Sequence, residues 1–78
     1  MKDEKEIQFE IIEKIVVLST DSKGWSKELN LVSWNHAAAK FDVRSWSEDH
    51  SRMGKGITLS EEEACILLDG LRTKLESM

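Results

Sequence analysis

The sequence lacks the residues that hold many small domains together. Its 78 residues include a single cysteine, Cys65, and only two histidines, His36 and His50. One thiol excludes an intrachain disulfide framework, and these three residues do not have the spacing of a zinc site, so we expect no metal and no cofactor. A domain this small buries only about 60% of its unfolded surface and commonly needs another support. We expect that support to be oligomerisation.

Long apolar segments are also missing. The longest unbroken apolar runs, such as residues 15–18, are far shorter than the ~20 residues of a membrane-spanning helix. Residues 1–5 are mostly charged and no apolar core follows them, so we expect no signal peptide. We therefore predict one domain over residues 1–78, with residues 1–5 disordered. Its expected location is the cytoplasm, where it could associate with the nucleoid, and no membrane partner is expected.

A net positive charge is absent too. The chain has 11 Lys+Arg and 15 Asp+Glu, a formal net charge of -4, which by itself argues against a nucleic-acid partner. The distribution reverses this, because residues 23–55 carry six basic and four acidic side chains and all three tryptophans. Basic side chains interleaved with aromatic ones are typical of platforms that bind single-stranded nucleic acid. The alternative is that the tryptophans are core residues and the charges form a solvated rim.

The hydrophobic pattern predicts four strands. Apolar and polar residues alternate at the start of the chain, but the phase slips at Ile11 and Ile12. A long strand with a bulge near residues 13–14, or two short strands, would produce this slip. The predicted strands cover residues 7–18, 25–34, 40–46 and 56–59, and residues 47–54 are predicted to form a loop.

The last segment predicts a helix. Ser60 at the N-cap and Glu63 at the third helical position form a capping box. The helix has an apolar stripe made of Ala64, Leu67, Leu68, Leu71 and Leu75. Four strands followed by one helix make an α+β domain, in which a single helix can cover only one face of the sheet. The other face is then expected to be solvated or occupied by a ligand.

The third predicted strand indicates what that ligand is. Phe41 and Val43 point to one face, whereas Lys40, Asp42, Arg44 and Trp46 point to the other. A large aromatic ring on the polar face of a strand is explained by base stacking, with nearby basic side chains following the phosphates. A dimer contact, or a cross-strand pair with another tryptophan, remains the alternative for Trp46.

Two glycines flank Lys55 in the sequence. Gly54 and Gly56 allow the backbone to approach a ligand closely, and Lys55 supplies a positive charge. The surrounding sequence does not match a nucleotide-binding P-loop. A hairpin turn with a solvent-facing lysine is the alternative interpretation.

Catalytic groups are sparse. His50 follows Asp49 directly, but adjacent loop residues seldom face one another, and Ser51 has no evident activating base. Cys65 lies within the predicted helix, where a thiol usually acts as a small hydrophobic group. We therefore predict that the chain is not an enzyme and has neither catalytic residues nor a small-molecule substrate.

Four segments together resemble a known family. Residues 23–25, 27–30, 42–46 and 53–60 are similar to the transcriptional coactivator family called positive cofactor four, and in particular to the C-terminal domain of its members and to the compact bacterial branch called YdbC-like. The resemblance covers nearly the whole chain from Phe9 onward. It implies a curved four-stranded antiparallel sheet followed by one helix, assembled as a homodimer through the helices and sheet edges. It also implies binding of single-stranded DNA with little sequence preference.

The resemblance also assigns positions. Arg44 and Lys55 match basic residues of the family, Trp46 matches the aromatic residue after the arginine, and Trp34 falls near a second stacking aromatic. Gly54 replaces a basic residue that eukaryotic members carry, so a weaker phosphate grip is expected there. The Ser-rich, acidic N-terminal region of those members has no counterpart in this sequence, so we do not expect a coactivator role that depends on it.

These observations predict a homodimeric, sequence-tolerant single-stranded DNA-binding protein that acts in transcription regulation or in DNA replication, repair or recombination. RNA binding, or a dimer that contacts the transcription machinery without touching nucleic acid, are the alternatives. The predicted nucleic-acid-binding residues are Lys23, Trp25, Lys27, Asn30, Ser33, Trp34, Lys40, Arg44, Trp46 and Lys55.

Overall fold

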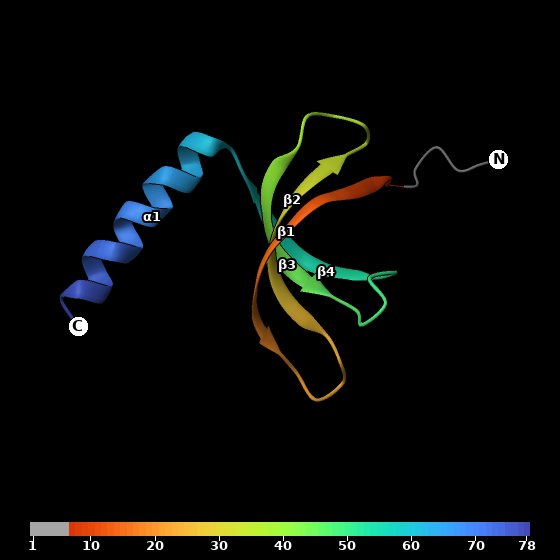
Figure 1. Cartoon of the computed structure of the whole chain (residues 1–78), viewed down its shortest axis with the longest axis horizontal. Coiled ribbons are helices and arrows are strands. Elements are labelled where there is room, and N and C mark those ends of the chain that lie inside the picture. The colour runs from red at the N-terminus through yellow and green to blue at the C-terminus, as the bar shows by residue number, and fades with distance from the viewer. Residues whose placement is uncertain (1–6) are drawn as a thin grey trace.

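The computed structural model describes residues 7–78 as a four-stranded antiparallel sheet followed by one helix, which confirms the predicted α+β fold (Figure 1). The strands follow one another across the sheet in the order β1-β2-β3-β4. The expected disorder of residues 1–5 lies outside the described residues. The elements are β1 (Phe9–Thr20), β2 (Ser26–Trp34), β3 (Lys40–Trp46), β4 (Met53–Leu59) and α1 (Glu61–Glu76).

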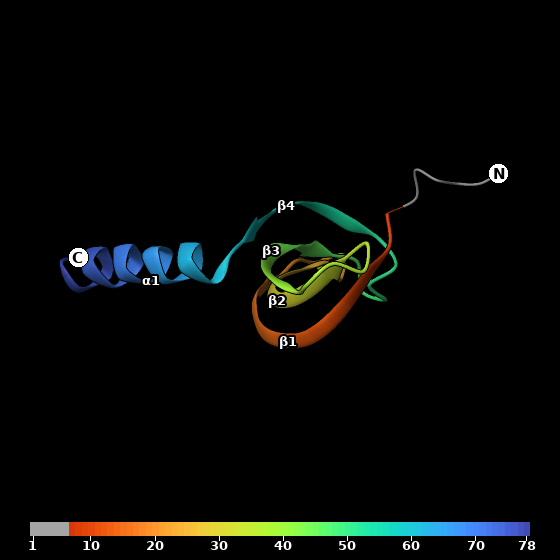
Figure 2. The same ribbon diagram turned by 90° about the horizontal axis from the view of Figure 1, so that it is seen from above.

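Strand β1 is irregular, as the slip in its hydrophobic phase predicted. Its register with β2 shifts between Ile11 and Glu13 and again at two later points along the strand. Each bulge adds a residue on one side of a strand pair and increases the local twist and bend. The sheet is accordingly curled, with the edge strands β1 and β4 bowing outward on either side of β2 and β3 and α1 standing apart from the sheet (Figure 2).

Strand β4 is longer than predicted. It begins at Met53, not at Gly56. The predicted loop over residues 47–54 therefore wrongly included Met53 and Gly54, which belong to the strand. Met53 pairs with Trp46, and a register shift between Arg44 and Trp46 accommodates the extra length. Glycines weaken the sequence signal of a strand, which is why the pattern missed this first part of β4.

The inner face of the curved sheet, defined by the buried side chains of Glu28, Asn30, Val32, Asp42 and Trp46, holds the core of the domain. These side chains come from β2 and β3, the two central strands. Strand pairing places Glu28 opposite Arg44 and Asn30 opposite Asp42. This core is unusual because most of its members are polar, and it therefore depends on internal hydrogen bonds.

Trp46 lies in the centre of this core and not on an open surface. Its side chain is 0% exposed, and its ring centre lies 5.1 Å from that of Phe9 and 5.6 Å from that of His50. Phe9 of β1 and His50 of the β3–β4 connection both pack against the ring on this face. The structure corrects the expectation that Trp46 has an accessible ring on a solvated face.

Helix α1 begins as the sequence predicted. The Ser60 hydroxyl accepts a hydrogen bond from the backbone N–H of Glu63 at 3.1 Å. The carboxylate of Glu63 in turn accepts one from the backbone N–H of Ser60 at 2.9 Å. This capping box satisfies two donors that an uncapped helix would leave exposed.

The helix does not lie flat on the sheet. Within α1 only Ala64 is partly buried, and Leu67, Leu68, Leu71 and Leu75 remain 44–61% exposed. A groove of about 290 Å³ separates Ala64, Leu67, Leu68 and Leu71 from an apolar outer face of the sheet. The outer face consists of Leu18, Leu29, Phe41, Val43 and Leu59. Within the described residues, no helix has both the length and the apolar character needed to cross a membrane.

Gly56 fits where no larger residue would. A Cβ atom at this position would lie 2.2 Å from Cβ of Arg44 and 2.3 Å from the carbonyl oxygen of Val43. We expect Gly56→Ala to destabilise the domain by about 3 kcal/mol, because the backbone of β3 would have to move. Chemical denaturation measures this loss as a lower unfolding midpoint.

Gly54 provides the matched control two residues earlier in the same strand. A Cβ atom there would meet Cβ of Ser45 at 3.7 Å, which is ordinary contact. Gly54→Ala is therefore expected to change stability by less than about 1 kcal/mol. Equal losses for the two variants would show that the close approach of Gly56 to Arg44 is not the cause.

Candidate nucleic-acid interface

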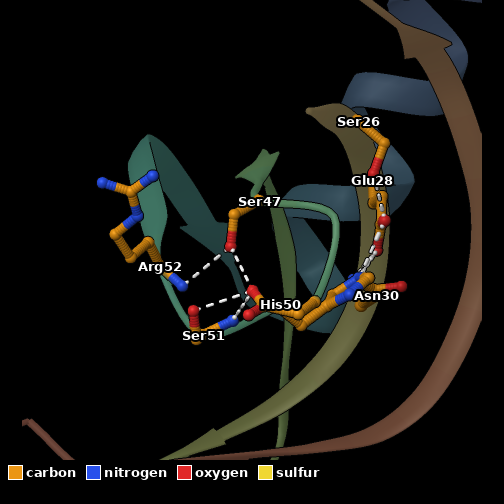
Figure 3. A network of polar contacts seen from close by, with 8 residues as sticks. Ser26, Glu28, Asn30, Ser47, His50, Ser51 and Arg52 are labelled. Atoms are coloured by element: carbon orange, nitrogen blue, oxygen red, sulfur yellow. Dashed lines mark hydrogen bonds and ion pairs between the residues drawn. The ribbon is translucent and has the colours of Figure 1, made fainter. Parts of the chain in front are cut away.

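Glu28 is the centre of a buried hydrogen-bond network on the inner face (Figure 3). Its carboxylate accepts hydrogen bonds from the Ser26 hydroxyl and, at 3.0 Å, from the side-chain amide of Asn30. Nε2 of His50 lies 2.9 Å from the second carboxylate oxygen. Burial alone would raise the pKa of Glu28, but these hydrogen bonds and the nearby imidazole lower it below its ordinary value of 4.5. The network fastens the β3–β4 loop to β2.

Arg44 is held by Asp42 in a bidentate ion pair. Nε and Nη2 of Arg44 donate to the two carboxylate oxygens of Asp42 at 2.7 and 2.8 Å. The remaining Nη1 donates to the carbonyl oxygen of Gly54 at 3.3 Å, and the guanidinium carbon lies 4.7 Å from the ring centre of Trp34. The side chains of Arg44 and Asp42 are 14% and 0% exposed. Little of the guanidinium is therefore left for a phosphate group.

The loop between β3 and β4 is organised around Asp49. Its carboxylate accepts hydrogen bonds from the backbone N–H and hydroxyl of Ser51 and from the hydroxyl of Ser47, at 2.7–3.0 Å (Figure 3). These bonds lower the pKa of Asp49 to about 2. The N–H of Ser47 donates to the carbonyl of Arg52 at 2.9 Å, and the N–H of Arg52 donates to the hydroxyl of Ser47 at 2.9 Å. These hydrogen bonds hold the backbone of the loop in one conformation, and with it the positions of the loop's surface side chains.

Two of the three tryptophans have partly accessible rings. Trp25 is half-buried, and the guanidinium carbon of Arg52 lies 5.7 Å from its ring centre. Trp34 is also half-buried, with its ring centre 5.9 Å from that of Phe9. The indole N–H groups of Trp34 and Trp46 are buried and have no hydrogen-bond partner within residues 7–78. Stacking on an open ring is possible at Trp25 and Trp34 but not at Trp46.

The predicted polar contacts divide into accessible and occupied groups. Asn30 is 1% exposed and bound to Glu28, and the Ser33 hydroxyl donates to the carbonyl of Ala37 at 2.6 Å. In this arrangement the amide of Asn30 and the hydroxyl of Ser33 each donate to a group of the protein. The accessible side chains are the exposed lysines Lys23, Lys27, Lys40 and Lys55.

The predicted residues do not all share one face of the sheet. Lys27 pairs with Ser45 and its neighbour Glu28 pairs with Arg44. Because successive side chains of a strand point to opposite faces, Lys27 lies on the face opposite Arg44. A strand of nucleic acid that touched both would have to pass over an edge or a loop end of the sheet.

A hollow between two loops brings together residues that are far apart in the sequence. This loop basin has a volume of about 560 Å³ and lies between the β1–β2 and β3–β4 connections. The sequence shows Arg52 only as one of the basic residues of the middle segment, residues 23–55. Its proximity to Trp25 depends on the fold and has no signal in the sequence. The basin is lined by Lys23, Trp25, Ser47, Glu48, Asp49 and Arg52.

The accessible side chains offer groups that bind nucleic acid. Within the described residues, no three His, Cys, Asp or Glu side chains are grouped closely enough to hold a metal ion. The accessible chemistry consists of two aromatic rings, each with an arginine against it, and of four exposed lysines, of which Lys23 lines the loop basin with Trp25. Aromatic rings bind the faces of bases, and lysines neutralise phosphates.

Comparison with known proteins agrees with this chemistry. Residues 22–70 match the protein family described as Transcriptional Coactivator p15 (PC4). The chain is also 43% identical over 68 residues to a protein of Treponema pallidum (strain Nichols) that carries the description "Uncharacterized protein". That similarity covers 87% of this chain and 80% of the relative.

Proposed function

The chain belongs to the transcriptional coactivator p15 (PC4) family, and on this premise we propose that it binds single-stranded DNA, with little sequence preference, as a homodimer. The family is known for single-stranded DNA binding and for coactivator roles in transcription. The observation that carries the proposal is the pair of half-exposed rings, Trp25 and Trp34, each with an arginine beside it. Stacking on such rings tolerates any sequence because every base has a π-face.

The charges support single-stranded binding more than duplex binding. Four lysines of the middle segment are exposed, and one of them, Lys23, lines the same hollow as Trp25, whereas the chain as a whole carries a net charge of -4. An acidic protein gains little from non-specific contact with duplex phosphates, so affinity depends on bases that can leave the stack. We propose that the protein acts in the cytoplasm on exposed strands, without catalysing a reaction on them.

The exposed apolar surface supports the homodimer. The leucines of α1 and the outer face of the sheet border one groove, and neither covers the other. Contiguous apolar surface of this kind marks an interaction site. A second copy of the same chain supplies a matching surface, because a two-fold interface uses the same patch twice.

A titration with labelled oligonucleotides of equal length tests the function. We expect fluorescence anisotropy to show binding of single-stranded DNA, with weaker binding of duplex. The logarithm of affinity should fall with the logarithm of salt concentration by about 0.7 for each phosphate neutralised. RNA of matched sequence is the second competitor, because a stacking surface does not by itself read the 2′-hydroxyl. Absence of binding to any oligonucleotide at low salt would overturn the proposal in favour of a protein-docking role.

A further inference from the structure

The loop basin has a preformed floor. The carboxylate of Asp21 accepts hydrogen bonds from the backbone N–H groups of Lys23 and Trp25, at 2.8 and 3.0 Å. Gly24 between them adopts φ +89°, a left-handed conformation that glycine tolerates best. The turn therefore fixes the direction in which Trp25 enters the basin, before any ligand binds.

Trp25 and Arg52 give the basin one aromatic and one cationic surface. The guanidinium carbon of Arg52 lies 5.7 Å from the ring centre of Trp25, and Lys23 also lines the hollow. Both a tryptophan ring and a guanidinium plane can stack on a nucleobase. The volume of about 560 Å³ leaves room for a base together with its phosphate.

The two carboxylates of the basin differ in what they already bind. Asp49 accepts three hydrogen bonds from its own loop. Glu48 is exposed, and within residues 7–78 its carboxylate has no hydrogen-bond or ion-pair partner. It lies directly over Gly24, since a Cβ atom on that glycine would be 3.0 Å from Oε1 of Glu48. An unused acceptor thus borders the residue that precedes Trp25.

We infer that the loop basin binds one nucleobase that carries an exocyclic amino group, an inference that rests on the proposed function. The base stacks on Trp25, its amino group donates to the carboxylate of Glu48, and Lys23 pairs with the phosphate. A carboxylate accepts from N4 of cytosine, whereas thymine presents its O4 acceptor at the same position. The basin therefore favours cytosine over thymine within a protein that otherwise tolerates any sequence.

Binding of equal-length oligo-dC and oligo-dT, measured by anisotropy at one salt concentration, tests this inference. The wild-type protein is expected to bind oligo-dC about fivefold more tightly, which is within the range of one charge-assisted hydrogen bond at a partly solvated site. Glu48→Gln should bring the ratio close to one, because the amide both donates and accepts. The ratio is the readout because loss of a negative charge strengthens binding to both oligonucleotides alike.

Glu76→Gln is the matched control, since it removes the same charge from the exposed end of α1. It should keep the wild-type ratio, while Trp25→Ala should weaken binding to both oligonucleotides. An unchanged ratio in a folded Glu48→Gln variant, or equal binding of both strands by the wild type, would overturn the inference and leave the proposed function standing. Failure of the wild type to bind either strand would overturn both.

Discussion

Arg44→Ala is expected to lose about 3–5 kcal/mol of folding free energy, because it leaves the Asp42 carboxylate buried without its partner. Asp42 is 0% exposed, and the two hydrogen bonds from Arg44 are the ones that hold its oxygens. A small domain has only about 0.05–0.15 kcal/mol of stability per residue, so this loss is a large share of the total. Urea or thermal unfolding followed by circular dichroism measures it.

Two further variants separate the causes of this loss. Asp42→Asn combined with Arg44→Ala removes the unpaired charge and should be more stable than Arg44→Ala alone. Arg44→Lys keeps the charge but cannot reproduce the bidentate geometry, so it should lie between Arg44→Ala and the wild type. A stable Arg44→Ala variant, or a double variant no more stable than it, would show that the pair is not structurally important.

The same pair affects how binding data are interpreted. The family resemblance predicts a phosphate contact at Arg44, so loss of DNA binding in an alanine variant would ordinarily be interpreted as loss of that contact. In the wild type, however, the Arg44 side chain is bound to Asp42 and only 14% exposed. The alanine variant would therefore lose affinity through unfolding as well. Lys55 and Lys23 are exposed and free of this complication, so alanine variants there report phosphate contacts more directly.

The local features of the fold were predictable from the sequence. The capping box at Ser60 and Glu63, the bulged first strand and the alternation in β3 depend on neighbouring residues, and all three are present. Alternation also placed Trp46 correctly on the face of Asp42 and Arg44. It could not show that this face curls inward, because curvature depends on bulges in β1 and on the packing of Phe9 against Trp46.

The tertiary parts of the candidate site were not predictable in the same way. Arg52 is 27 residues from Trp25 in the chain, and only the folded sheet brings the two loops together. In the sequence the obvious partner of His50 is its neighbour Asp49, but in the structure its imidazole contacts Glu28 on β2. The position of α1 was also open, because an apolar stripe shows that a helix face is buried without showing what covers it.

The stripe on α1 leads to the second large effect. We expect Leu71→Ala to raise the dissociation constant of the proposed homodimer by about 10³-fold, because a two-fold interface loses the same side chain twice. Each loss is about 2 kcal/mol, since Leu71 is 51% exposed in the single chain and a partner would cover it. Sedimentation or light scattering over a range of concentrations measures the shift.

Thr73→Ala is the matched control, because it changes a residue in the same turn of α1 that lies off the apolar stripe. It should leave the dissociation constant within a few-fold of the wild type. If the wild-type protein is a stable monomer at micromolar concentration, or if both variants dissociate equally, the stripe is not the dimer interface. If only Leu71→Ala dissociates, the melting temperature of the wild type should rise with protein concentration, because its folding is coupled to association, and that of the dissociated variant should not. In that case the second copy provides the support that a chain of 78 residues with one cysteine lacks.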